Sequence, residues 1–377
     1  MEQNQPIKIL HILKNIQRGG VEQFLLNQYR ILKTKNIRFD FCLYGPDTSK
    51  DDAYMIQTFQ SMGSRFFYLP YPNKHFLKFR NAFKHTLKEQ NYQIVHCHQN
   101  LFSGVILPIA KAAQVPVRIA HAHTSKERKN LSVPRKAYTH LMRRQIKRAS
   151  THVLGASYAA NKFVFGTKEE AEFLPNGIEL ESFLKVSEQS LRKELGLPSD
   201  SLLIGHVGSF KQIKNHPFLL EVFHEYSLQN QNAHLILIGD GEELQKMKEY
   251  AETLGIKRKV HFLGNREEIA ELLIDLDLFL FPSLFEGLGI SLIEAQAAGI
   301  RSLASNTIPS EVDLGLGILR FLDLNQPEDW VETIKQLLSE EYTKPSIEER
   351  CKIIQTKGFN SESSAERLQK IYEEAIR

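Results

Sequence analysis

The sequence is poor in cysteine and has no long hydrophobic run, and these absences exclude several classes of protein. Its 377 residues include three cysteines, too few and too widely spaced for a disulfide framework or a four-cysteine metal site. No stretch approaches the ~20 uninterrupted apolar residues of a membrane-spanning helix. The N-terminal residues also lack the basic region and apolar segment of a secretory signal. We therefore expect a cytosolic protein that does not cross a membrane.

The composition excludes disorder, collagen and coiled coil, and is that of a folded protein with about two domains. Hydrophobic residues make up 42% of the chain and charged residues 24%. The formal net charge of +4 conceals an asymmetry between the two halves. Residues 1–175 carry 27 Lys and Arg against 11 Asp and Glu, a net of +16, which leaves a net of −12 for residues 176–377. This difference indicates an anionic surface partner for the first half alone.

Short apolar, β-branched runs alternate with helical patterns along the chain. Strands are expected at residues 7–13, 39–44, 65–69, 94–98, 117–121 and 152–154, and again at residues 202–207, 234–238, 260–262, 278–281, 302–304 and 319–322. Helices are expected at residues 21–32, 76–90, 101–113, 134–148, 217–228, 243–254, 269–273 and 290–298. This alternation predicts an α/β fold with parallel sheets and helices on both faces.

The two halves are predicted to be separate doubly wound domains. Pro175 and the Asn-Gly pair after it are the strongest turn formers between the halves, so we place a hinge there. The predicted domains are residues 1–175 and residues 176–360. Residues 361–377 are predicted to form a C-terminal helix whose candidate packing partner is the first domain. Ligands of such folds bind at the carboxyl ends of the strands, so functional residues are expected in the turns after strands.

The most informative segment is FLFPSLFEGLGISLIEAQAAG, at residues 279–299. Glu286 follows a predicted strand, and a predicted helix carrying Glu294 begins after Gly287, Leu288 and Gly289. Backbone amides at a helix N-terminus favour a phosphate, and Glu294 lies about 6 Å along the helix, a suitable distance from a nucleotide's pyrophosphate to its ribose. Two solvated glutamates on an amphipathic helix are the alternative. The glycines at a strand-to-helix turn favour the nucleotide site.

Glu286 and Glu294, with seven residues between them in this segment, resemble the retaining glycosyltransferases of family 4. That family has the GT-B fold, in which two Rossmann-like doubly wound parallel-sheet domains face each other across a cleft. The resemblance extends over essentially the whole chain, with further markers at Gly19 and Gly20 and at residues 121–124, 175–178, 206–210, 214–216 and 239–242. LysAsnHis at residues 214–216 and GluAlaGlnAlaAlaGly at residues 294–299 are most similar to the branch that builds capsular polysaccharides and exopolysaccharides.

The resemblance implies a role for each matching residue. Glu294 would bind the ribose of a nucleotide sugar, and the amides of Gly287, Leu288 and Gly289 would hold its phosphates. Glu286 would hold the sugar, Lys214 would neutralise the pyrophosphate, and His123 would contact the donor sugar. Gly19, Gly20 and Ser209 stand where donor-binding residues are expected, although a tight turn alone also explains the two glycines.

The implied reaction is the retaining transfer of a hexosyl or N-acetylhexosaminyl group. The donor is expected to be a UDP-sugar and the acceptor a lipid-linked saccharide, and no metal or other cofactor is expected. Two departures from the family pattern stand out. Ser209 replaces an arginine that usually contacts the diphosphate, with Lys211 as a candidate replacement, and Arg301 replaces a proline, which we expect to affect packing more than catalysis.

Two patterns leave a metal site open from the residues alone. His96 and His98, like His121 and His123, follow one strand face, but no acidic or thiolate ligand is grouped with them, because Cys97 points to the opposite face. We therefore disfavour zinc. AspLeuAsp at residues 275–277 has the spelling of a metal-binding motif, yet it precedes a strand rather than following one, and we expect a loop there.

The basic excess of the first half is concentrated in residues 126–148, which contain nine Lys and Arg and one acid. A helix suited to an anionic bilayer is predicted there, with one basic side (Arg143, Arg144, Lys147 and Arg148) and one apolar side (Leu141, Met142 and Ile146). A solvated helix face is the simpler alternative. Nucleic acid is disfavoured, because Tyr138 is the one aromatic residue there for base stacking. We expect peripheral association with the inner face of the cytoplasmic membrane.

Two other functions remain alternatives at this point. A sugar-nucleotide epimerase would share the fold and the donor grip, but it needs further acids and bases for proton transfer at C2 and has no use for a lipid-facing basic helix. A non-catalytic sugar-nucleotide binder is suggested by Ser209 in place of the usual arginine.

Overall fold

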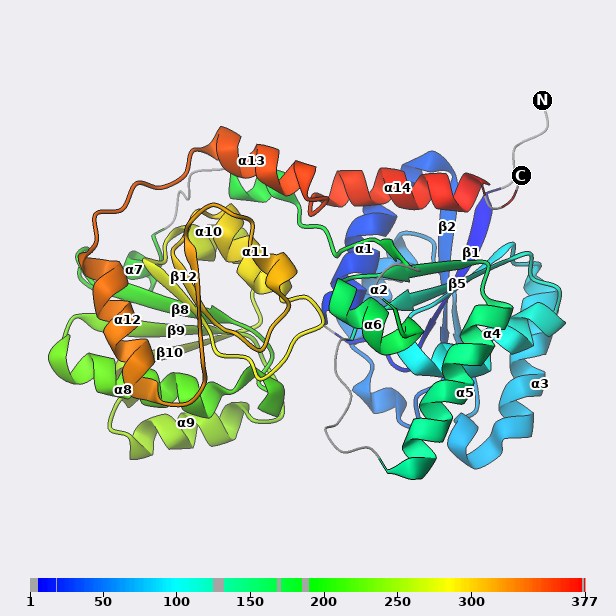
Figure 1. Ribbon diagram of the computed structural model, residues 1–377, viewed down its shortest axis with the longest axis horizontal. Coiled ribbons are helices and arrows are strands. Elements are labelled where there is room, and N and C mark those ends of the chain that lie inside the picture. The colour runs from blue at the N-terminus through cyan, green and yellow to red at the C-terminus, as the bar shows by residue number, and fades with distance from the viewer. Residues whose placement is uncertain are drawn as a thin grey trace. The chain divides into compact units, whose positions relative to one another are not determined.

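The computed structural model describes residues 6–17, 19–124, 132–167, 171–184, 190–374 and 376 (Figure 1). The chain divides into two units. Unit 1 contains Met1–Gly177 and Gly358–Arg377, and unit 2 contains Ile178–Lys357. The first boundary falls two residues beyond the expected position at residue 175. The second falls between residues 357 and 358, so the C-terminal segment belongs to unit 1.

Unit 1 is built on a seven-stranded parallel sheet with the order β3-β2-β1-β4-β5-β6-β7. The strands are β1 (Ile7–Leu13), β2 (Ile37–Leu43), β3 (Phe66–Tyr68), β4 (Ile94–Cys97), β5 (Val117–Ala122), β6 (His152–Gly155) and β7 (Glu172–Phe173). The central strands are rich in Ile, Leu and Val, which is typical of strands buried on both faces. The register of β1 against β4 pairs His11 with His96.

Helices cover both faces of this sheet. They are α1 (Gly20–Leu32), α2 (Ala53–Ser61), α3 (Pro72–Gln90), α4 (Ser103–Ala112), α5 (Val133–Ala149), α6 (Tyr158–Phe165) and α14 (Ser361–Glu374). One apolar core joins the sheet to α1, α2 and α14, and the other joins it to α3, α4, α5 and α6. Helix α14 therefore packs in unit 1, beside α1 (Figure 1).

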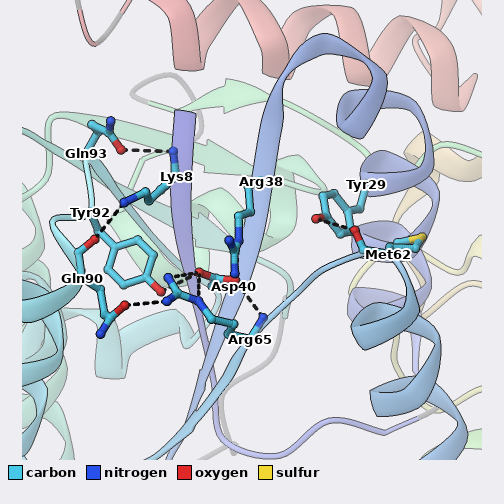
Figure 2. Close-up of polar contacts among 9 residues, drawn as sticks. All are labelled: Lys8, Tyr29, Arg38, Asp40, Met62, Arg65, Gln90, Tyr92 and Gln93. Carbon is cyan, nitrogen blue, oxygen red and sulfur yellow. Dashed lines mark hydrogen bonds and ion pairs between the residues drawn. The ribbon is translucent and has the colours of Figure 1, made fainter. Parts of the chain in front are cut away.

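A buried carboxylate ties the edge strand β3 to its neighbour (Figure 2). Asp40 on β2 is fully buried, and its Oδ1 accepts hydrogen bonds from the backbone N–H of Arg65 at 2.8 Å and from Arg38 Nε at 3.1 Å. Its Oδ2 accepts from Arg65 Nη2 at 3.0 Å and from the Tyr92 hydroxyl at 2.7 Å. Arg65 also donates to Gln90 Oε1 at the end of α3. The charge of Asp40 is thus compensated where water is excluded.

The chain leaves unit 1 through a segment that packs on the start of α14. Gly177 lies so close to this helix that a Cβ there would be 2.6 Å from the backbone nitrogen of Ser361. Ser364 Oγ donates to the carbonyl of Pro175 at 3.4 Å, and Gln28 Nε2 donates to the carbonyl of Ser361. The glycine predicted as part of a hinge therefore has a second role, because only glycine fits against α14.

Unit 2 has a six-stranded parallel sheet with the order β10-β9-β8-β11-β12-β13. The strands are β8 (Leu202–Val207), β9 (Ala233–Ile238), β10 (Val260–Gly264), β11 (Leu278–Phe281), β12 (Ser302–Ser305) and β13 (Leu319–Leu322). The helices are α7 (Leu191–Glu194), α8 (His216–Gln229), α9 (Leu244–Thr253), α10 (Ile269–Ile274), α11 (Ile290–Ala297), α12 (Pro327–Ser339) and α13 (Ile347–Thr356). Helices α8, α9 and α12 share one core with the sheet, and α11 contacts α10 and α13. The predicted α/β class with parallel sheets is confirmed in both units.

Short 3-10 turns connect several of these elements. They are Lys33–Lys35, Thr48–Lys50, Asn100–Phe102, Leu180–Phe183, Gln212–Lys214, Lys257–Lys259 and Ser310–Val312. The turn at Gln212–Lys214 follows β8 and carries one of the predicted site residues.

Candidate active site

In unit 2 the candidate nucleotide site lies where β11 leads into α11. Gly289 precedes the helix with a φ of +99°, in the left-handed region that glycine favours. Gly289 has no side chain to cap this helix, and N–H groups at the start of a helix can bind an anion. Gly287 is partly exposed, whereas Leu288 is buried, so Leu288 offers a ligand its backbone rather than its side chain.

Two of the predicted site residues form a direct ion pair. Lys214 Nζ donates to Glu286 Oε1 at 2.7 Å, and the two side chains keep 13% and 12% of their surface exposed. Lys214 Nζ also lies 4.9 Å from the centre of the Phe281 ring. The backbone N–H of Leu284 donates to the carbonyl of Ile213 at 2.8 Å, which joins the loops after β8 and β11. Adjacent strands therefore bring Lys214 and Glu286 together.

Glu294 lies on α11 within electrostatic reach of the same lysine. Loss of solvation raises the pKa of its carboxyl from the ordinary 4.5 to about 7, and the positive charge of Lys214 opposes this shift. The carboxyl is therefore partly protonated in neutral solution. A ligand whose hydroxyl groups donate to the carboxylate would favour the ionised form, so ligand binding and ionisation of Glu294 are expected to be linked.

Ser209 lies in the turn after β8, and glycines shape its surroundings. Gly239 approaches this turn so closely that a Cβ there would lie 2.2 Å from the carbonyl oxygen of Gly208. A Cβ on Gly208 would in turn lie 3.2 Å from Lys214 Cδ and Cε. Ser209 is partly exposed and the side chain of Lys211 is exposed. Lys214 is therefore the cation that packing and an ion pair hold at this turn.

Two marker histidines for which sequence reasoning gave no role lie in the interior next to this turn. His206 Nδ1 donates to the carbonyl of Leu280 at 2.8 Å, which identifies the tautomer of the neutral ring. The ring of His216 stacks on Phe210 with centroids 4.1 Å apart. Burial and the charge of Lys214 lower the pKa of His216 to about 3. Both rings are therefore neutral packing elements beside the loop that carries Lys214.

In unit 1, Gly19 and Gly20 form the turn from β1 into α1. A Cβ on Gly19 would lie 2.8 Å from Glu22 Oε2, and Asn176 Nδ2 donates to the carbonyl of Gly20 at 2.9 Å. Asn176 is buried. The structure thus joins two of the family markers, the Gly-Gly turn and the segment at residues 175–178, within one unit.

His123 belongs to a cluster of five histidines at the ends of β1, β4 and β5. One hydrogen-bonded chain runs from His11 Nδ1 to His98 Nε2 at 3.0 Å and from His98 Nδ1 to His123 Nε2 at 2.9 Å. His11 was missed in the sequence analysis, where its position near the end of a predicted strand is the one available signal; the structure pairs it with His96. Burial lowers the pKa of His11 and of His123 to about 3, so both rings are neutral at neutral pH.

The second chain of this cluster reaches the C-terminal helix. The Tyr372 hydroxyl on α14 lies 2.7 Å from His96 Nδ1, and His96 Nε2 lies 3.2 Å from His121 Nδ1. Two groups of three rings bring one nitrogen each within 4.8 Å of one another and could hold a metal ion (His11, His96 and His98, or His98, His121 and His123). The hydrogen bonds between the rings already engage most of these nitrogens.

AspLeuAsp at residues 275–277 has structural partners: Asp277 accepts from Arg192 Nη2 and from the N–H of Leu203.

The structure corrects the predicted surface of the basic helix α5. Met142 and Ile146, which were predicted to face a bilayer, are buried in the unit 1 core, and only Leu141 of that apolar set is exposed, at 48%. Arg143 donates through Nη2 to the carbonyls of Lys162 and Phe163, so it holds α6 in place. Arg144, Lys147 and Arg148 are exposed. The part of the basic segment at residues 126–131 lies outside the described residues.

The second departure from the family pattern, Arg301, lies in packing contacts. Its guanidinium lies 4.7 Å from the centre of the Tyr342 ring and donates to the carbonyls of Leu337 and Glu340.

Among the described helices of both units, none combines the length and the hydrophobicity that crossing a membrane requires.

The sequence matches two family descriptions that follow each other along the chain. Residues 18–182 match "Glycosyltransferase Family 4", and residues 187–358 match "Glycosyl transferases group 1". The chain is 34% identical over 336 residues to the protein named EpsF in Bacillus subtilis (strain 168), which covers 87% of this chain and 86% of EpsF. It is 29% identical to the capsular polysaccharide biosynthesis glycosyltransferase CapH of Staphylococcus aureus, over 88% of this chain and 91% of CapH.

A more distant relative matches over almost the full length. The UDP-Gal:alpha-D-GlcNAc-diphosphoundecaprenol alpha-1,3-galactosyltransferase of Escherichia coli is 24% identical over 97% of this chain and 96% of its own. Among solved structures, Anabaena Alr3699/HepE in complex with UDP-glucose superposes with a TM-score of 0.79 at 18% identity, over 97% of this chain and 99% of that one. WaaG, a glycosyltransferase involved in lipopolysaccharide biosynthesis, superposes with a TM-score of 0.68 at 17% identity, over 98% of both chains.

The solved structures confirm the GT-B fold, with its two Rossmann-like domains. Fold alone does not determine function. The family assignment rests on the two consecutive sequence matches and on more than 30% identity to a relative across most of both chains. The chain belongs to glycosyltransferase family 4 and is a glycosyltransferase.

Proposed function

We propose that the protein transfers a hexosyl or N-acetylhexosaminyl group from a UDP-sugar to a lipid-linked saccharide, with retention at the anomeric carbon, in the synthesis of a capsular polysaccharide or exopolysaccharide. The observation that carries the proposal is the arrangement in unit 2, where Lys214 pairs with Glu286 and lies near Glu294 at the start of α11. The name of CapH supports the pathway, and the name of the galactosyltransferase from Escherichia coli supports the UDP donor and the lipid-linked acceptor.

Each residue has a distinct task in the proposed reaction. The bond between the anomeric carbon and the diphosphate breaks, and its electron pair stays on the leaving UDP. The acceptor's hydroxyl oxygen forms a new bond to the anomeric carbon on the same face, and the hydroxyl proton passes to the leaving diphosphate. Lys214 and the N–H groups at the start of α11 stabilise this negative charge, while Glu294 accepts hydrogen bonds from the ribose hydroxyls. Glu286 holds the sugar. A role of His123 at the donor sugar stays a prediction. This division of labour requires neither a metal ion nor another cofactor.

The proposed acceptor also requires the enzyme to work at a membrane surface. The exposed side chains of Arg144, Lys147 and Arg148 would provide electrostatic attraction to anionic lipids on the inner face of the cytoplasmic membrane. The exposed part of α5 has no apolar stripe, because Met142 and Ile146 are buried, so α5 would contribute charge rather than insertion.

The test is a panel of UDP-sugars incubated with lipid-linked saccharide acceptors, with release of UDP as the readout and the anomeric configuration of the product as a second one. Interconversion of the donor sugar in the absence of an acceptor would indicate the epimerase instead. If no donor gives turnover and calorimetry detects no UDP binding, the proposal is wrong.

Point variants separate the two glutamates. Glu294→Ala should weaken UDP binding by about 1.5 to 3 kcal/mol, the loss of charged hydrogen bonds, and should weaken UDP-sugar binding equally. Glu286→Ala should leave UDP affinity almost unchanged and depress turnover. Glu332→Ala is a matched control in the same unit, because Glu332 is 80% exposed on α12. Equal losses of UDP affinity in the two site variants would contradict the assigned tasks.

Ser209 allows the non-catalytic alternative to be tested directly. If the serine is the reason for weak or absent turnover, Ser209→Arg should raise the rate of UDP release, because it adds a cation at the turn that carries the diphosphate contact. If Lys214 is sufficient, the wild-type protein turns over and the variant gives no gain.

A further inference from the structure

Two large apolar side chains are exposed next to each other at the start of α3 in unit 1. Phe76 and Leu77 leave 47% and 63% of their surface exposed. A single exposed apolar residue is common on a protein surface. Two adjacent ones, bordered by basic residues, indicate a surface that meets something other than water.

The packing of α3 explains why these side chains are left outside. Helix α3 contacts the sheet through Phe79, Phe83 and Leu87, which are buried and spaced four residues apart. The backbone of His75 leaves the helical conformation, with a φ of −141° and a ψ of 56°, so the regular helix begins at Phe76. Phe76 and Leu77 therefore precede the buried stripe and are not part of the core.

The charges along this part of the chain are positive. The sequence has no Asp or Glu between Asp52 and Glu89, and six basic residues fall in that interval (Arg65, Lys74, Lys78, Arg80, Lys84 and Lys88). Lys74, Lys78 and Arg80 are exposed beside the apolar pair.

This part of the chain lies at the carboxyl edge of the unit 1 sheet, where α3 and α5 both begin. Tyr71, just before α3, and Tyr138 on α5 are both close enough to Tyr44 to raise the pKa of its hydroxyl. Helices α3, α4 and α5 pack on the same face of the sheet (Figure 1). Val133, the first residue of α5, is 79% exposed. The exposed apolar residues thus share an edge with the start of the basic helix α5.

We propose that Phe76 and Leu77 insert into the interface of an anionic lipid bilayer, while Lys74, Lys78 and Arg80 contact its headgroups. We call these five residues the α3 docking surface. Aromatic and aliphatic side chains bordered by lysine and arginine are the combination that binds such an interface. A second copy of the chain is a poorer occupant, because a symmetric contact would oppose two basic surfaces. The proposal rests on the lipid-linked acceptor of the proposed function.

The test is sedimentation of the full-length protein with vesicles of phosphatidylcholine alone and of phosphatidylcholine with 30% phosphatidylglycerol. The double variant F76S/L77S removes the apolar part of the α3 docking surface, and K74E/K78E reverses two of its charges. The control is L228S, because Leu228 is 58% exposed on α8 of unit 2. A third variant, R144E/K147E/R148E, measures the contribution of α5.

The wild type and L228S should bind the anionic vesicles and bind the neutral vesicles only weakly. F76S/L77S should bind at least tenfold more weakly. K74E/K78E should lose more than the roughly fivefold expected for each neutralised charge, and 1 M salt should abolish most of this difference. Because all four positions are exposed, the thermal midpoint of each variant should match that of the wild type.

Three results would overturn the proposal. One is F76S/L77S binding as tightly as the wild type. Another is a wild type that ignores anionic vesicles. The last is a wild-type dimer in size-exclusion chromatography that F76S/L77S converts to a monomer, which would make a second copy the occupant. UDP binding by calorimetry is measured on the same samples without lipid, so failure of the proposed function and failure of the docking surface are seen separately.

Discussion

The raised pKa of Glu294 makes the stability of unit 2 and its affinity for UDP respond to pH in opposite directions. Burial shifts the pKa from 4.5 to about 7 in the folded protein. The stability contributed by the protonated carboxyl is therefore fully present below pH 4.5 and is lost as the pH rises through 7. A shift of this size corresponds to about 3 kcal/mol. Glu294→Gln, which cannot ionise, should therefore be more stable than the wild type by up to about 3 kcal/mol at pH 8 and about equally stable at pH 4.5.

Trp330 provides the assay for this comparison. It is the single tryptophan of the chain, and it is fully buried in the core of unit 2, so its fluorescence reports the unfolding of that unit. Urea titrations are carried out on the wild type, Glu294→Gln and the exposed control Glu332→Gln at pH 5, 6, 7 and 8. The difference in free energy of unfolding between Glu294→Gln and the wild type should grow with pH, whereas that between Glu332→Gln and the wild type should not. Parallel curves for the wild type and Glu294→Gln across this range would refute a desolvated carboxyl at position 294.

UDP affinity should follow the opposite course. If only the ionised carboxylate accepts hydrogen bonds from the ribose, its population rises about tenfold from pH 6 to pH 8 for a pKa near 7, and the affinity rises with it. Glu294→Gln should bind UDP more weakly, and its affinity should retain only the pH dependence of the nucleotide itself. The ratio of the two affinities, measured by calorimetry, isolates the residue. A ratio that stays constant with pH would mean that Glu294 does not grip the ribose.

Three further changes test the arrangement of charges and buried polar groups. Lys214→Met should weaken UDP binding by about 2 kcal/mol and move the pKa of Glu294 above 7, because Lys214 opposes its rise. Calorimetry over the same pH series measures both effects. If the pH midpoint of UDP affinity does not move, Lys214 and Glu294 are not coupled. Asp40→Ala leaves the donors on Arg65 and Tyr92 without their buried acceptor and should destabilise unit 1 by about 2 to 4 kcal/mol in circular dichroism melts, whereas the exposed Asp200→Ala should have little effect. Tyr372→Phe removes one hydrogen bond to His96 and should cost about 1 to 2 kcal/mol with no change in UDP affinity; a neutral variant would show that the hydroxyl is not needed to hold α14.

Periodicity predicted the strands well because a buried parallel strand is a continuous run of apolar residues. The predicted bounds of β1, β8, β11 and β13 are those of the structure. Five helices were missed, namely α2, α6, α7, α12 and α13. Helix α12 had a sufficient signal, because Pro327 stands in its first turn and Trp330, Ile334 and Leu337 follow helical spacing. Helix α6 is short, and its clearest mark is the serine cap, in which Ser157 Oγ accepts from the N–H of Ala160.

The error on α5 has a geometric cause. Leu141 and Met142 are neighbours in sequence and therefore about 100° apart around a helix, and in the structure Met142 faces the core while Leu141 is exposed. Helix α4 settles which of them is buried, because Gly104 lets the backbone of α5 approach it. A Cβ on Gly104 would lie 2.6 Å from the carbonyl oxygen of Met142. Tertiary packing of this kind is not visible in the pattern of α5 alone.

The sequence predicted which residues belong to the candidate site but not which of them are in contact. The glycine turn before α11 and the spacing of the two glutamates are local features, so the sequence is sufficient to identify them. The bond between Lys214 and Glu286 depends on how the loops of two adjacent strands meet, 72 residues apart along the chain. The same holds for Asn176 and Gly20, which are 156 residues apart. Pairs of this kind require the strand order, which a single sequence does not reveal.

The ion pair has a consequence for the order of events in the proposed reaction. Lys214 forms an ion pair with Glu286, and its positive charge also acts on Glu294. A diphosphate at the start of α11 adds negative charge beside the same lysine and competes with Glu286 for it. Glu286 then loses its ion pair with Lys214, at the position where the sugar attached to that diphosphate is proposed to bind. Binding of the nucleotide would in this way prepare the sugar-binding residue, and UDP alone should break the Lys214–Glu286 pair.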